Sequence, residues 1–131
     1  MPFRRKTIVI VEDEKDTAEM FAEMIRLNGF QVINAYSGAQ AISQIASNKP
    51  DLVVMDLMIP DVPGLDVIQQ MQRDPSLKRI PVIIVSARSM LADLRAGLSA
   101  GAVNYLTKPV AYAELIAAIT RALEVKAAPL G

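Results

Sequence analysis

Three acids, one hydroxyl and one amine stand at or just after the ends of short apolar runs in this sequence, and together they could handle a phosphoryl group. They are Glu12, Asp13, Asp56, Ser86 and Lys108. Two carboxylates about 4 Å apart repel by about 4 kcal/mol at an effective dielectric near 20, so clustered acids need a cation. Lys108 supplies one positive charge, and a hard divalent ion such as Mg²⁺ suits the remaining oxygen ligands. If these side chains converge, they form a magnesium site with room for phosphate oxygens.

The hydroxyl and the amine complete this chemistry. Ser86 can donate a hydrogen bond to an anionic oxygen, and Lys108 can neutralise another. A carboxylate beside such groups can itself act as the nucleophile, and we predict that Asp56, the most central acid, accepts the phosphoryl group. Each residue alone has a plainer interpretation, as a helix N-terminal acid, a turn former, a helix cap or a surface charge. Their placement on one common edge is what favours a site.

Composition excludes several other kinds of chemistry. The 131 residues are 52% hydrophobic and carry no net charge, which fits one folded domain. The sequence has no Cys and no His, so thiolate and imidazole catalysis, disulfides and Cys-ligated metals are excluded. No apolar run approaches the roughly 20 residues of a membrane span, and the balanced charge offers no basic surface for nucleic acid. We therefore expect a cytoplasmic protein that binds neither membrane nor nucleic acid directly.

Apolar runs alternate with helical patterns five times along the chain, and this alternation predicts the fold. The runs are rich in Val and Ile, as buried strands are, and they cover Thr7–Val11, Phe30–Tyr36, Leu52–Met55, Val82–Val85 and Val103–Leu106. Strand–helix alternation gives parallel strands joined by right-handed crossovers. We therefore predict an α/β fold, a doubly wound parallel sheet of five strands with helices on both faces, whose ligands bind at the carboxyl ends of the strands.

The five predicted helices follow from apolar residues that recur at helical spacing. Ser37 stands where it could cap the second helix. The fourth helix has Leu91, Leu94 and Leu98 on one side, which favours that side for packing.

Four motifs, in this order, resemble the receiver domain of two-component response regulators, of the chemotaxis-regulator type. They are V-E-D-E at 11–14, V-V-M-D-L-M-I-P-D-V-P-G at 53–64, V-S-A at 85–87 and Y-L-T-K-P at 105–109. The separations of 43, 30 and 22 residues between Asp13, Asp56, Ser86 and Lys108 also resemble those of that family.

The resemblance implies a flavodoxin-like (βα)5 fold with strand order 2-1-3-4-5. It spans about residues 6 to 125, so we expect residues 1–131 to form a single receiver domain whose core covers that range. Residues 126–131 would be a tail or the start of a linker.

The resemblance also implies roles for the acids. Asp56 would accept a phosphoryl group from a sensor histidine kinase or a histidine phosphotransfer protein, in a reaction that depends on Mg²⁺. Asp13, Asp56 and the backbone carbonyl of Met58 would bind the metal, and Glu12 would act through water. Glu12 replaces a frequent Asp of the family, and this substitution should preserve metal binding.

The resemblance also implies how phosphorylation would change the conformation of the domain. Ser86 and Lys108 would hold the phosphoryl oxygens, and Tyr105 would be the aromatic residue that turns inward when Ser86 moves toward the phosphoryl group. The Lys108–Pro109 peptide bond would be cis, which costs only about 0.5–1 kcal/mol before proline. The responding surface would comprise the fourth helix, the fifth strand and the fifth helix. It would signal to a downstream protein or output domain, and phosphorylation-dependent homodimers are compatible with the resemblance.

Two residues border the path that an attacking water would take to the phosphoryl group. They are Met58 and Arg88, each two residues beyond Asp56 or Ser86. Neither side chain readily positions or activates water. We therefore predict slow autodephosphorylation and no other enzymatic activity.

Three alternative functions use a similar set of residues. A haloacid-dehalogenase-like phosphatase also has an Asp nucleophile and Mg²⁺, but it needs a second acid where this sequence has Met58. A flavodoxin-like module for FMN needs a phosphate-binding loop where Glu12, Asp13 and Glu14 would repel phosphate. A receiver-like scaffold without phosphorylation is the third alternative, and the intact acceptor set argues against it.

Overall fold

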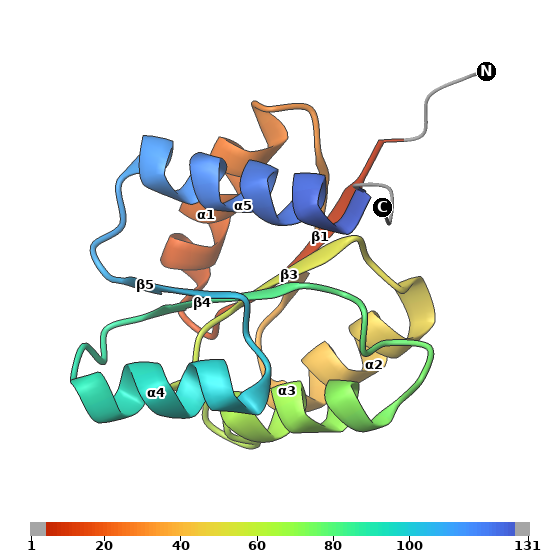
Figure 1. Cartoon of the computed structure of the whole chain (residues 1–131). Coiled ribbons are helices and arrows are strands. Elements are labelled where there is room, and N and C mark those ends of the chain that lie inside the picture. The colour runs from red at the N-terminus through yellow and green to blue at the C-terminus, as the bar shows by residue number, and fades with distance from the viewer. Residues whose placement is uncertain (1–4, 128–131) are drawn as a thin grey trace.

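The computed structural model describes residues 5–127, which form a parallel sheet of five strands between two layers of helices (Figure 1). The strand order is β2-β1-β3-β4-β5 and every pairing is parallel, so the predicted doubly wound α/β fold is confirmed. The elements are β1 (Thr7–Val11), α1 (Lys15–Arg26), β2 (Gln31–Ala35), α2 (Gly38–Asn48), β3 (Leu52–Met55), α3 (Gly64–Arg73), β4 (Val82–Ser86), α4 (Leu91–Ala100), β5 (Asn104–Thr107) and α5 (Tyr112–Ala127).

Each face of the sheet has its own hydrophobic core. Helices α1 and α5 cover one face, and α2, α3 and α4 cover the other (Figure 1). Successive residues of a strand point to opposite faces, and β1 divides accordingly. Ile8 and Ile10 join the core beneath α1 and α5, whereas Val9 and Val11 join the core beneath α2 and α3. Burial on both faces explains why the strands are nearly continuous apolar runs.

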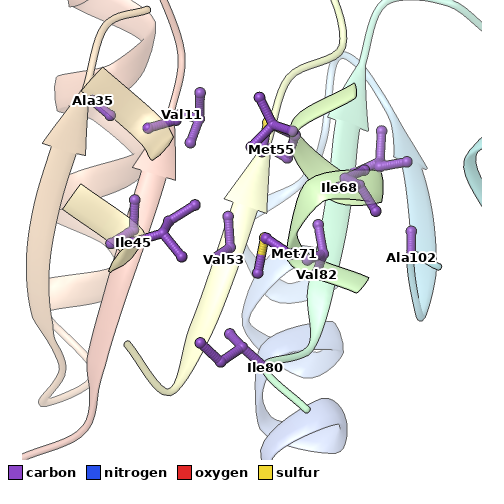
Figure 2. Close-up of a cluster of buried hydrophobic side chains, with 14 of the residues drawn as sticks. Val11, Ala35, Ile45, Val53, Met55, Ile68, Met71, Ile80, Val82 and Ala102 are labelled. Atoms are coloured by element: carbon purple, nitrogen blue, oxygen red, sulfur yellow. The ribbon is translucent and has the colours of Figure 1, made fainter. Parts of the chain in front are cut away.

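The core beneath α2 and α3 anchors the central strand β3. Figure 2 shows Val53 and Met55 of β3 among Ile45 of α2 and Ile68 and Met71 of α3, all of them buried. Burying one side chain of this size contributes about 1.5–3 kcal/mol. The close packing fixes β3 firmly, and Asp56 is the next residue along the chain.

Of the three leucines on the predicted packing side of α4, only Leu94 packs against the core. Leu91 and Leu98 are 61% and 50% exposed, and the buried residue of this helix is Gly97. A Cβ at Gly97 would lie 2.6 Å from Cδ1 of Ile84 and 3.0 Å from Cδ2 of Tyr105. The helix backbone therefore approaches the sheet at a glycine, and this close approach leaves Leu91 and Leu98 facing outward.

The ends of the elements differ slightly from those predicted. Strand β5 begins and ends one residue later, and Val103 lies before it and is 55% exposed. Helix α5 continues to Ala127, two residues past the expected end of the core, and residues 128–131 of the expected tail lie outside the described residues. Within residues 5–127, no helix is long and apolar enough to cross a membrane.

Candidate phosphoacceptor site

Backbone hydrogen bonds place the ends of neighbouring strands side by side. The amide of Asp56 donates to the carbonyl of Val11 at 2.9 Å, and the amide of Lys108 donates to the carbonyl of Ser86 at 2.8 Å. The first bond continues the pairing of β3 with β1, and the second continues that of β5 with β4. All the polar residues predicted at strand ends therefore lie along one edge of the sheet.

Three carboxylates gather at this edge. Glu12, Asp13 and Asp56 each offer an oxygen, and these oxygens lie within 4.8 Å of one another. Glu12 and Asp56 are only 3% and 6% exposed, whereas Asp13 is open to solvent. Hard oxygen donors at this spacing, with one side open, fit Mg²⁺.

The side chain of Lys108 bridges the two buried acids. Its Nζ lies 2.5 Å from Oε1 of Glu12 and 2.9 Å from Oδ2 of Asp56. One ammonium cannot balance three carboxylates, and among the described residues no ion pair involves Asp13. The site therefore keeps an excess of negative charge that attracts a further cation.

Burial and the hydrogen bond from Lys108 have opposite effects on the pKa of Glu12. Burial raises the pKa of Glu12 above its ordinary 4.5, although the hydrogen bond from Lys108 partly opposes this rise. Burial alone would lower the pKa of Lys108, but its hydrogen bonds to Glu12 and Asp56 outweigh that effect and raise the pKa above 10.5. The folded protein therefore holds the lysine in its charged form.

The raised pKa of Lys108 predicts how stability changes at high pH. The unfolded chain loses this proton near pH 10.5 and the folded chain only at higher pH, so the stability that the proton supplies is complete below that pH and is lost above it. We expect the free energy of unfolding in urea to fall from about pH 10 upward, and to fall less steeply in Lys108→Met. A slope equal to that of the wild type in Lys108→Met would contradict this, and Lys78→Met, which changes an exposed lysine, is the control.

Both oxygens of Asp56 have partners. Oδ1 accepts a hydrogen bond from the amide of Met58 at 2.9 Å, and Oδ2 accepts one from Lys108. The carboxylate is therefore fixed in one orientation at the bottom of the acid cluster. The side chain of Met58 is 52% exposed and borders the site.

Ser86, Arg88 and Tyr105 form a connected group beside the acids. Ser86 is fully buried, and its Oγ accepts a hydrogen bond from the amide of Arg88 at 3.2 Å. The phenol of Tyr105 donates to the carbonyl of Arg88 at 2.8 Å, and the ring is only 9% exposed, so it lies inward in this structure. Burial raises the pKa of the Tyr105 phenol, which stays neutral. The Lys108–Pro109 peptide bond is cis.

Asp61 makes contacts near the site that the sequence analysis did not predict. The carboxylate of Asp61 accepts hydrogen bonds from the amides of Gly38 and Ala39, at 2.7 and 2.9 Å. The sequence offers one weak signal for it, an Asp within a Pro-rich turn that follows the acceptor. Nothing in the pattern says that it reaches a helix more than twenty residues away in the chain.

Comparisons with known proteins decide the family. The model of the response regulator receiver domain matches residues 8–120. The chain belongs to this family. The receiver domain is 38% identical over 117 residues to the response regulator MprA of Mycobacterium sp. (strain KMS), covering 89% of this chain and 49% of MprA. It is 37% identical over 112 residues to the transcriptional regulatory protein PrrA of Mycobacterium tuberculosis, covering 86% of this chain and 47% of PrrA.

Solved structures agree with this assignment. The receiver domain of the Francisella response regulator 1452 superimposes with a TM-score of 0.86 at 27% identity, over 92% of this chain and 98% of that one.

The present chain spans about half the length of the curated relatives it matches.

Proposed function

We propose that this receiver domain accepts a phosphoryl group on Asp56 from a sensor histidine kinase or a histidine phosphotransfer protein. The observation that carries the proposal is the contact between the buried Asp56 carboxylate and Lys108 inside a cluster of three acids. The carboxylate of Asp56 is held in one orientation beside the ammonium of Lys108. The exposed Asp13 leaves one side of the cluster open to a ligand. Receiver domains generally signal rather than catalyse turnover, and the same is proposed for this one.

The reaction is an in-line displacement at phosphorus. An oxygen of Asp56 forms the new P–O bond, the P–N bond of the donor phosphohistidine breaks, and the imidazole leaves with the electron pair. Lys108 lies 2.9 Å from Oδ2 of Asp56, and it would neutralise one phosphoryl oxygen. Mg²⁺, held by Asp13, Asp56 and the Met58 carbonyl with Glu12 acting through water, would supply further charge neutralisation.

The signal would leave the site through Ser86 and Tyr105. Phosphorylation adds about 1.5 to 2 negative charges, and the hydroxyl of Ser86 would move toward them and favour the inward position of the Tyr105 ring. The surface formed by α4, β5 and α5 carries exposed Leu91, Leu98 and Val103. We propose that the chain acts as a single receiver domain and that this surface binds a downstream protein or an output domain. The same surface could instead pair two copies of the chain after phosphorylation. A cytoplasmic location stays a prediction.

A phosphodonor experiment tests the proposed function. Purified protein is incubated with acetyl phosphate, with and without Mg²⁺, and its intact mass is measured. We expect the mass to increase by one phosphoryl group with the metal and not with a chelator, and no increase in Asp56→Ala. Asp66→Asn, which changes an exposed acid of α3, should be labelled like the wild type. A wild type that stays unlabelled would support the scaffold alternative.

The lifetime of the phosphoryl group gives a second prediction. Met58 borders the site and has no group that can position water, so we expect slow autodephosphorylation. Met58→Asn introduces an amide that can hold a water near the phosphorus. We expect decay about tenfold faster, less than the roughly 10²–10⁴-fold typical of a full general acid or base, because an amide positions water without taking its proton. Decay is followed by intact mass after removal of the donor. A decay rate of Met58→Asn no faster than that of the wild type would contradict the prediction. Met20→Asn is the control, because Met20 is an exposed methionine of α1.

A further inference from the structure

Asp61 connects the loop after the acceptor to the beginning of α2. It lies in segment 57–63, which joins β3 to α3, and its Oδ1 and Oδ2 accept hydrogen bonds from the amides of Gly38 and Ala39 at 2.7 and 2.9 Å. The first N–H groups of a helix have no partner inside the helix. Ser37, the residue that precedes α2, caps only the amide of Gln40, at 3.1 Å. The first two amides of α2 are therefore satisfied by a residue of a different element.

The loop backbone also packs directly on α2. A Cβ at Gly38 would lie 2.5 Å from Cβ of Val62 and 2.9 Å from its carbonyl oxygen. A side chain larger than that of glycine would clash at this position, so the start of the helix lies directly against the loop backbone. The two hydrogen bonds of Asp61 and this contact act at the same place.

Few other hydrogen bonds hold segment 57–63. Pro60 and Pro63 have no N–H, the amide of Met58 bonds to the neighbouring Asp56, and the carbonyl of Leu57 accepts from Gly64 at 3.3 Å. Within the described residues, the hydrogen bonds from this segment to an element distant in the sequence are those of Asp61. Ile59 also packs into the core beneath α2 and α3, so Asp61 adds the hydrogen-bonded attachment of the loop that carries Met58 to a distant element.

We propose that Asp61 is a positioning residue of the phosphoacceptor site, which fixes the Met58 carbonyl and the Asp56 carboxylate by fastening their loop to α2. This inference rests on the proposed function, because it assigns Asp61 a part in metal binding and phosphorylation. The negative carboxylate lies at the positive end of the α2 dipole, which strengthens the attachment. The hydrogen bonds from Ala39 and Gly38 also lower the pKa of Asp61, so it stays charged.

The variant Asp61→Asn tests this role. An amide keeps the size of the side chain but places an NH₂ group against one of the two backbone donors, so one hydrogen bond and the negative charge are lost. Asp74→Asn is the matched control, because Asp74 accepts hydrogen bonds from the amide and hydroxyl of Ser76, at 2.9 and 2.8 Å. Asp74 follows the far end of α3, away from the acids.

Two measurements separate the inference from the proposed function. Amide hydrogen exchange in metal-free protein should be faster at Gly38 and Ala39 in Asp61→Asn and unchanged there in Asp74→Asn. Calorimetric titration with Mg²⁺ should give a dissociation constant about tenfold higher for Asp61→Asn, the low end for groups that orient metal ligands. Phosphorylation by acetyl phosphate should slow in parallel.

The outcomes are distinct. If the wild type binds Mg²⁺ and is labelled but Asp61→Asn matches it, the inference fails and the proposed function stands. The inference also fails if Asp74→Asn weakens Mg²⁺ binding as much as Asp61→Asn, since the effect would then be general destabilisation. If the wild type neither binds Mg²⁺ nor is labelled, the proposed function fails and takes the inference with it.

Discussion

Replacing Lys108 by methionine should lower the free energy of unfolding of the metal-free protein by about 3 kcal/mol at neutral pH, the low end for removing one partner of a buried ion pair. The ammonium lies between Glu12 and Asp56, which are only 3% and 6% exposed. Without it, the two buried carboxylates face each other with no cation between them. Burial already raises the pKa of Glu12, and the hydrogen bond from Lys108 opposes that rise, so removal of the lysine should raise this pKa further.

Urea unfolding with a chelator present measures this effect. Lys78→Met is the control, because Lys78 is exposed and has no ion pair among the described residues. Mg²⁺ should restore more stability to Lys108→Met than to the wild type, since the metal then provides the missing positive charge. If Lys108→Met is as stable as the control, the lysine does not hold the acids together and the electrostatic account of the site is wrong.

The second large effect concerns Asp13, the exposed member of the acid cluster. We expect Asp13→Asn to raise the dissociation constant for Mg²⁺ at least about a hundredfold, since a unit charge at about 4 Å is worth several kcal/mol and each 1.4 kcal/mol is about tenfold. The same change removes one of three mutually repelling carboxylates. The metal-free variant should therefore be more stable than the wild type, by up to about 1 kcal/mol for a group this exposed.

Calorimetric titration and urea unfolding of Asp13→Asn check both halves of this prediction. Asp16→Asn is the matched control, because Asp16 is an exposed acid in the first turn of α1. Metal binding that weakens equally in both variants would mean that Mg²⁺ responds only to the general charge near α1. A variant that binds Mg²⁺ as tightly as the wild type would remove Asp13 from the ligand set.

The sheet and the location of the site could be predicted because both depend on local patterns. Apolar runs such as Leu52–Met55 mark strands buried on both faces, and their carboxyl ends must share one edge of a parallel sheet. Asp56 and Lys108 therefore had to lie near each other, although 52 residues separate them in the chain. The cap of α2 by Ser37 was predictable for the same reason, since it depends on neighbouring residues.

Contacts that depend on tertiary packing could not be predicted in this way. The outward position of Leu91 and Leu98 follows from the approach of Gly97 to Ile84 and Tyr105, which no periodicity reveals. The hydrogen bonds of Asp61 to α2 likewise join residues whose nearness is set by the packing of Val62 on Gly38. Sequence patterns predict which face or edge a residue occupies and which neighbouring amide it can cap, but not which backbone group a side chain reaches in a distant element.

Chemical trapping of the acyl phosphate identifies the residue that carries the phosphoryl group, and it is the most direct test of Asp56 as the acceptor. The protein is phosphorylated with acetyl phosphate and Mg²⁺, reduced with borohydride, which converts an aspartyl phosphate to homoserine, and digested for tandem mass spectrometry. We expect homoserine at position 56 alone, and none when the metal is removed. Homoserine at Asp13 or Asp61, or none at all in the presence of Mg²⁺, would contradict it.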